Sequence, residues 1–171
     1  MIKKVYISAI VFITMITLSG CSNMIATNHQ AVKNLLVKTK LDKDSKVVIA
    51  TIVNINNIES SSPLGRTISE QLTTKFVDAD MQVIEMKLRK SIYVKRTTGE
   101  LILSRKVSKL AKAVNADAIV AGTYSNAKDT VYINLRIIDP KTQRIISTVD
   151  YVLKKDKDIR KLLGEKESRW E

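Results

Sequence analysis

The hydrophobic pattern of the first half of the body predicts two strands joined by a helix. Lys46–Val53 is a nearly continuous run of apolar and β-branched residues, which is typical of a strand buried on both faces. Met81–Met86 has the shorter pattern of a half-buried strand. With a helix between them, the two segments are expected to form a right-handed crossover unit.

The segment from Pro63 to about Asp78 is predicted to be that helix. Ser62 is a good N-cap, and Pro63 suits the first helical position, where no hydrogen-bond donor is missed. The apolar residues then repeat every fourth position, at Leu64, Ile68, Leu72 and Phe76. This spacing places them on one face of an amphipathic helix.

A second core helix is expected later in the chain. Its apolar residues recur at helical spacing, at Val107, Leu110, Ala111 and Val114. Ser104 or a neighbour would cap its start, and it would end near Asn115. Asp117–Tyr124, which follows, is nearly continuous in apolar and small residues, as in a central strand.

The remaining pattern predicts a C-terminal β-hairpin. Apolar and polar residues alternate from Val131 to Ile137, as expected for a strand with one covered face. Asp139–Thr142 has the composition of a turn, and Ile145–Leu153 would return as the partner strand. Residues 154–171 form a charged tail with one expected helix, suggested by Ile159, Leu162 and Leu163.

The N-terminus has the features of a lipoprotein signal. Lys3 and Lys4 precede an uncharged apolar segment, Val5–Leu18, which is short for a membrane span. Leu18–Cys21 reads as a bacterial lipobox, so residues 1–20 are predicted to be removed and Cys21 to be acylated. More than one acyl chain would make the anchor nearly permanent, because each buried methylene contributes roughly 0.8 kcal/mol.

Residues 21–45 are expected to form a lipidated tether. Ser22–Gln30 has no periodic pattern and is interpreted as linker, and a short amphipathic helix is expected from Ala31. Fully extended, the tether would reach about 80 Å, at roughly 3.3 to 3.6 Å per residue. Ser22 follows the cysteine in place of an aspartate retention signal, which favours the outer membrane, with the domain facing the periplasm.

These elements predict an α/β (α+β) fold at residues 46–153. We expect a single small domain with a mixed sheet of about four to five strands, packed by two helices and ending in the hairpin. Cys21 is the only cysteine, so no disulfide is available and the apolar core must hold the fold.

The charge balance is strongly basic, with a formal net charge of +12. Export and an aromatic content of 5% argue against nucleic acid as a partner. Two interpretations stay open: contact with anionic headgroups, lipopolysaccharide phosphates or cell-wall carboxylates, and general solubility. The candidate interaction surface is a basic run formed by Lys87, Arg89, Lys90, Lys95 and Arg96. A solvated charged face is the alternative for this run.

The sequence nominates no catalytic residues, cofactor or metal site. His29 is the only histidine and is interpreted as a solvated linker residue, so a histidine-containing triad cannot be assembled. Serines 60–62 precede a helix, where capping is a simpler explanation than phosphate binding. Asp78, Asp80 and Glu85 are explained by a solvated helix end and strand edge.

Four short stretches, in this order, resemble the FlgO family of outer-membrane lipoproteins associated with flagella and motility. They are Ser62, Leu64, Gly65 and Arg66 with Ser69–Leu72; Glu100–Arg105; Ala121–Tyr124; and Arg136–Asp139 with Lys141 and Thr142. The resemblance covers roughly Val47–Leu153. It departs from the family pattern at Gln143, where a glycine is usual.

The resemblance implies a small periplasmic α/β domain related in shape to the lipoprotein domains of LpoB and CsgG, which bind protein partners and are not enzymes. It favours a non-catalytic outer-membrane lipoprotein that supports flagellar assembly through protein contacts or self-association. The alternative is a periplasmic lipoprotein that activates a cell-wall synthase or another envelope complex. The implied partners are outer-membrane lipid, through acylated Cys21, and an envelope or flagellar protein.

Overall fold

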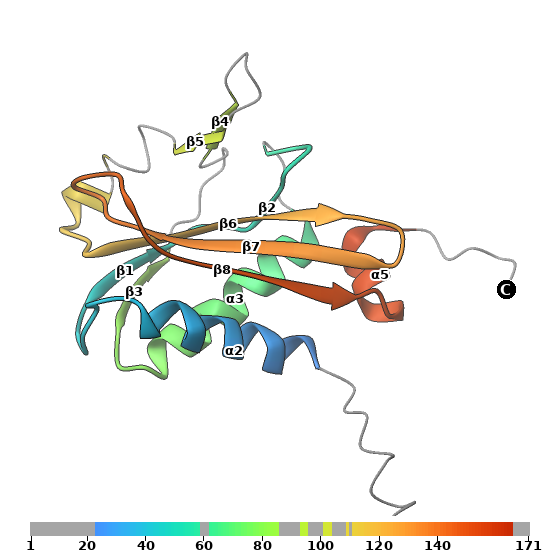
Figure 1. Ribbon diagram of the computed structural model, residues 1–171, viewed down its shortest axis with the longest axis horizontal. Helices are drawn as coiled ribbons and strands as arrows, with labels where there is room; N and C mark the ends of the chain where they lie inside the picture. Colours follow the sequence, from blue (N-terminus) through green and yellow to red (C-terminus); the bar gives the residue numbers. More distant parts are fainter. Residues whose placement is uncertain are drawn as a thin grey trace, which may run out of the picture.

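A mixed β-sheet with helices packed against it forms the body of the molecule (Figure 1). The computed structural model describes residues 23–58, 62–85, 93–95, 101–103, 109 and 111–165. The strand order is β3-β1-β6-β7-β8, with β2 also paired to β6. The strands are β1 (Lys46–Ile49), β2 (Val53–Asn54), β3 (Gln82–Glu85), β6 (Ala118–Asn126), β7 (Thr130–Ile138) and β8 (Ile145–Lys154). The predicted mixed α/β domain is confirmed.

Two further strands form a separate antiparallel pair. They are β4 (Tyr93–Lys95) and β5 (Leu101–Leu103), and Tyr93 pairs with Leu103.

One face of the main sheet is covered by α2 (Met24–Val37), α3 (Pro63–Val77) and α5 (Lys157–Leu163). Helix α3 supplies the apolar stripe that its spacing predicted, and Leu64, Ile68, Leu72 and Phe76 are all 0% exposed. Burial of each such side chain stabilises the fold by about 1.5 to 3 kcal/mol. The core therefore lies mainly between this face and the three helices.

The predicted β-α-β crossover is present. Strand β1 pairs in parallel with β3, from Lys46 opposite Gln82 to Ile49 opposite Glu85, and α3 connects the two strands. The single strand predicted at Lys46–Val53 is wrong, because β1 ends at Ile49 and pairing resumes only at β2. Between them, the Ile52 N–H donates to Ser69 Oγ of α3 at 3.0 Å instead of to a neighbouring strand.

The predicted C-terminal hairpin is formed by β7 and β8, and β7 also pairs with β6. Alternate residues of β7 are buried against the helices, at Val131, Ile133, Leu135 and Ile137. The residues between them face the other side of the sheet, where Tyr132 is 54% exposed. The alternation of apolar and polar residues therefore predicted correctly which face of β7 is covered.

A smaller apolar cluster covers part of that other face. It includes Val48, Val53, Ala111, Ile119 and Ile138. Residues 111–113 are helical, in the segment where the second core helix was predicted. Val107, Leu110 and Ser104 of that prediction lie outside the described residues.

Helix α2 begins well before its predicted start at Ala31. Asn23 caps the helix by accepting from the Ile25 N–H at 2.9 Å, so the interpretation of Met24–Gln30 as linker is wrong. The buried face of the helix contains Asn28, Ala31, Val32 and Leu35. The polar residue Asn28 occupies a core position, so the first two turns lack the continuous apolar spacing that predicts a helix.

The hairpin turn accommodates Gln143 in a left-handed conformation. Its φ is 61°, in the region that glycine adopts most freely, which gives a physical reason for the glycine that the resemblance leads one to expect there. Asp139 organises the turn as predicted, since its Oδ1 accepts from the Lys141 N–H at 2.7 Å and the Thr142 N–H at 3.1 Å. These backbone hydrogen bonds hold the pKa of Asp139 below its usual value.

The ordered body continues past Leu153. Asp156 caps α5 by accepting from the Ile159 N–H at 2.8 Å, and Ile159 is buried in the main core. Gly164 ends the helix with a φ of 75°. The predicted terminal helix is therefore present and packs against α3.

Candidate interaction surfaces

Most residues that the sequence singled out for interaction lie outside the described part of the chain. This holds for Cys21 and for Lys87, Arg89, Lys90 and Arg96. Lys95 lies on β4, for which only the backbone is described. The lipidated cysteine and the basic patch therefore stay predictions.

The first family stretch forms a structural junction between α3 and the sheet. Ser62 caps α3 by accepting from the Gly65 N–H at 3.0 Å, and the Tyr124 hydroxyl donates to the same Ser62 oxygen at 2.8 Å. The Ser69 hydroxyl donates to the Gly65 carbonyl at 2.9 Å. These side chains are used to hold elements together, which supports capping as the role of Ser62.

Gly65 makes this junction possible. A Cβ at this position would lie 1.9 Å from the Ile52 carbonyl oxygen, so α3 meets the break between β1 and β2 in backbone contact. Gly122 in β6 has a related role, because a Cβ there would lie 2.5 Å from the Asn134 oxygen and 2.9 Å from the end of Ile52. The local sequence around each glycine does not contain this reason, because both contacts are made only in the folded structure.

The carboxylates considered as a catalytic cluster are engaged with separate lysines at the surface. Lys75 contacts Asp78 at 3.3 Å, and Lys43 contacts Asp80 at 2.6 Å. The side chain of Glu85 is not described. The structure thus gives Asp78 and Asp80 different partners and does not assemble them into a site.

His29 lies on α2 and is half-buried, which corrects its interpretation as a solvated linker residue. Within residues 23–58, 62–85 and the later described segments, no three His, Cys, Asp or Glu side chains are grouped to hold a metal ion.

A buried polar chain ties α2 to both α3 and β8. The Tyr151 hydroxyl donates to Asn28 Oδ1, and Asn28 Nδ2 donates to Gln71 Oε1 at 2.5 Å. Asn28 is 0% exposed, and burial raises the pKa of Tyr151 well above its usual value. A phenol that stays neutral and donates to an amide is a structural link rather than an acid or base.

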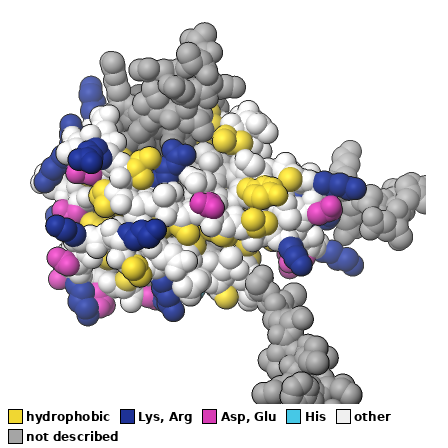
Figure 2. All heavy atoms as spheres, viewed as in Figure 1, with side chains coloured by type: hydrophobic (Ala, Val, Ile, Leu, Met, Phe, Trp, Pro, Cys, Tyr) yellow, Lys and Arg dark blue, Asp and Glu magenta, His cyan; other side chains and the backbone are white. Residues whose placement is uncertain are grey.

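The open face of the sheet exposes a pair of apolar side chains. Tyr132 and Val152 lie directly opposite each other on β7 and β8 and are 54% and 47% exposed. Figure 2 shows a hydrophobic patch over this part of the two strands. Aromatic and aliphatic side chains exposed together are typical of protein contact surfaces.

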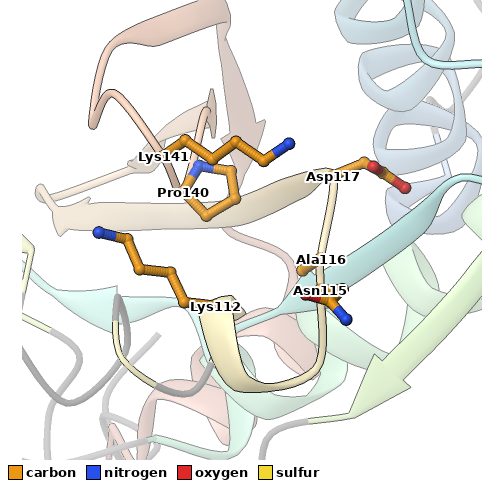
Figure 3. A pocket seen from close by; sticks show the side chains of 6 residues that line it. All are labelled: Lys112, Asn115, Ala116, Asp117, Pro140 and Lys141. Carbon is orange, nitrogen blue, oxygen red and sulfur yellow. The ribbon is translucent and has the colours of Figure 1, made fainter.

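A hollow of about 510 Å³ lies at one end of the sheet. One wall is the β7–β8 turn, with Pro140 and Lys141, and the opposite wall is the segment before β6 (Figure 3). That segment contributes Lys112, Asn115, Ala116 and Asp117. The volume is in the range of small-ligand sites.

Comparison with known families identifies the chain. Residues 29–158 match the family model described as FlgO protein, which is most of the sequence. The chain belongs to the FlgO family. A search of curated proteins found no significant match.

Solved structures agree with this FlgO assignment at the level of fold. The LpoB C-terminal domain from Salmonella enterica is similar, with a TM-score of 0.57 and 11% identity, over 74% of this chain and 95% of that one. The LpoB C-terminal domain from Escherichia coli gives 0.54 and 12%, over the same shares. A PelC L103M dodecamer from Paraburkholderia phytofirmans gives 0.50 and 14%, over 69% and 77%. The FlgO chain therefore has an LpoB-like fold.

The family match supports an envelope-associated lipoprotein. None of the described helices in this FlgO chain has the length and hydrophobicity needed to cross a membrane.

Proposed function

We propose that the protein is a non-catalytic outer-membrane lipoprotein, anchored by acylated Cys21 and facing the periplasm, that supports flagellar assembly and motility through protein contacts. The family match carries this proposal. Ser62, Asp78 and Tyr151 have structural partners, in a helix cap, an ion pair and a buried link.

The start of α2 sets how far the domain can move from its anchor. The helix begins at Met24, three residues after Cys21, and it is packed into the core. Three residues span at most about 11 Å, at roughly 3.6 Å each. The lipid and the folded body would therefore be close together, and the reach of about 80 Å expected from the sequence is not available.

A short reach of this kind would favour the flagellar role over the synthase activator. An activator of a synthase in the inner membrane needs a long flexible segment to cross the periplasm from the outer membrane. The LpoB-like fold alone does not supply that segment, because the likeness covers the folded domain. A protein held beside the outer membrane is better placed to support a structure that passes through it, as a flagellum does.

The exposed pair on the open face is our candidate for the protein contact. Tyr132 and Val152 protrude from paired strands, so their positions are fixed by the sheet and little conformational entropy is lost when a partner binds. Self-association through this face is the alternative partner. The PelC relative is described as a dodecamer, which shows that a related fold can assemble.

A deletion strain tests the proposed function. Loss of the gene is expected to reduce swimming and the number of flagella, while envelope integrity and β-lactam sensitivity stay unchanged, and a wild-type copy restores swimming. Lysis or β-lactam sensitivity with normal swimming would instead support the synthase activator.

The same strain tests the contact face. A copy with Tyr132→Ser and Val152→Thr should restore less swimming than wild type, because it removes exposed apolar surface without changing the core. Val37→Thr is the matched control, since Val37 lies on α2 and is 83% exposed. Equal rescue by both copies would exclude this face as the contact.

A further inference from the structure

We infer that the hollow between the β7–β8 turn and the segment before β6 binds carboxylate groups of the peptidoglycan stem peptides. The choice of ligand rests on the proposed outer-membrane anchor, whereas the anion-binding chemistry rests on the structure alone. The charges in the hollow, its hydrogen-bonded walls and its position in the molecule support this assignment.

The cations of the hollow are available to a ligand. Lys112 and Lys141 come from opposite walls, and both are exposed (Figure 3). Neither side chain makes a hydrogen bond or an ion pair with another described residue. Both lysines line the hollow and keep ammonium donors unfilled, so the lining offers two cationic groups to an anion.

The acidic groups nearby are already engaged. Asp117 Oδ2 accepts from the Lys46 N–H at 2.8 Å, at the start of β1. Asp139 accepts from two backbone N–H groups of its own turn, and Lys141 contributes to lowering its pKa. These hydrogen bonds hold the walls in place, and the two lysines of the lining outnumber its one carboxylate, Asp117, so the hollow carries a net positive charge.

Both walls are built by hydrogen-bonded turns. In the β7–β8 turn, the Asp139 N–H donates to the Arg144 carbonyl at 2.9 Å, and Pro140 is buried. In the opposite wall, the Ala116 N–H donates to the Ala111 carbonyl at 2.8 Å, and the Asp117 N–H donates to the Lys46 carbonyl at 2.8 Å. A ligand would thus meet a preformed hollow and would need to order only the two lysine side chains.

The position of the hollow in the molecule determines which anions it would meet. Figure 1 shows the β7–β8 turn and the segment before β6 at one end of the sheet, whereas α2 begins toward the other end. An anchor at Cys21 would hold the start of α2 near the leaflet, and α2 itself is about 21 Å long, at 1.5 Å per residue. The hollow would then face the cell wall, and the carboxylates of stem peptides are the anions that it would meet there.

Sedimentation with purified peptidoglycan sacculi tests the inference, using the acylated full chain in detergent. The double variant Lys112→Glu and Lys141→Glu should bind about tenfold more weakly, because two attractive charges become repulsive. Lys128→Glu with Lys154→Glu is the matched control, since it makes the same charge change at exposed lysines away from the hollow. Circular dichroism checks that both variants are folded.

Sacculi whose carboxylates have been amidated should bind the wild-type chain as weakly as the double variant binds untreated sacculi. Equal losses in the two variants would indicate general charge attraction and overturn the inference. A lack of binding by the wild-type chain would also overturn the inference. If the Lys112/Lys141 variant nevertheless reduced swimming, the ligand of the hollow would be an acidic protein instead. The sedimentation result does not depend on motility, so its failure would leave the flagellar proposal standing.

Discussion

Gly65→Ala is expected to destabilise the protein by roughly 3 kcal/mol or more, because the new methyl group would overlap backbone atoms. The Cβ would lie 1.9 Å from the Ile52 carbonyl oxygen and 3.1 Å from its carbon. Relief requires α3 to move away from the sheet, which disturbs the Ser62 cap and the Ser69 hydrogen bond to Ile52. Urea unfolding followed by circular dichroism measures the loss.

The sign of the effect makes this test sharp. In an isolated helix, glycine to alanine stabilises by about 1 kcal/mol, so helix propensity alone predicts the opposite result. Glu70→Ala is the control in the same helix, where the side chain is exposed, and its effect should stay within about 0.5 kcal/mol. A Gly65→Ala protein as stable as wild type would show that α3 does not contact the strand break.

Asn28→Ala is expected to cost about 2 to 4 kcal/mol, because it empties a fully buried position and leaves two partly buried polar partners unsatisfied. The Tyr151 hydroxyl loses its acceptor, and Gln71 Oε1 loses its donor. The penalty should therefore exceed that of removing one hydrogen bond from the surface. The free energy of unfolding in urea is the measurement.

Two further variants separate the polar chain from simple loss of volume. Asn34→Ala lies on the same helix at an exposed position and should change stability by less than about 0.5 kcal/mol. Tyr151→Phe in the Asn28→Ala background should cost less than it does in the wild type, because the hydroxyl has already lost its acceptor. Additive losses would show that Tyr151 and Asn28 are not coupled.

The sequence predicted the elements whose side-chain period matched their burial. Helix α3 and strand β7 fall in this class, because the residues at the predicted apolar spacing, such as Leu72 of α3 and Ile133 of β7, are buried on one covered side. Helix α2 was predicted too short because Asn28 occupies a core position, and a buried amide cannot be distinguished from an exposed one in a sequence. The break in Lys46–Val53 depends on a contact with Gly65, which the local pattern does not contain.

The hollow was harder to predict, because its residues are brought together only by the order of the strands in the sheet. Lys112 and Lys141 are far apart in sequence, and they share a hollow only because β6 begins beside the turn that joins β7 to β8.

For the junction between α3 and the sheet, one signal was present in the sequence. Gly65 stands among apolar positions at the start of a helix, where glycine is unfavourable unless another backbone approaches closely.

Metabolic labelling with a clickable palmitate tests the central claim, that Cys21 is acylated and holds the domain at the outer membrane. Wild-type protein is expected to take up the label and to fractionate with outer membranes, and Cys21→Ala protein is expected to do neither. Unlabelled wild-type protein in the soluble fraction, or equal labelling of the variant, would contradict the account.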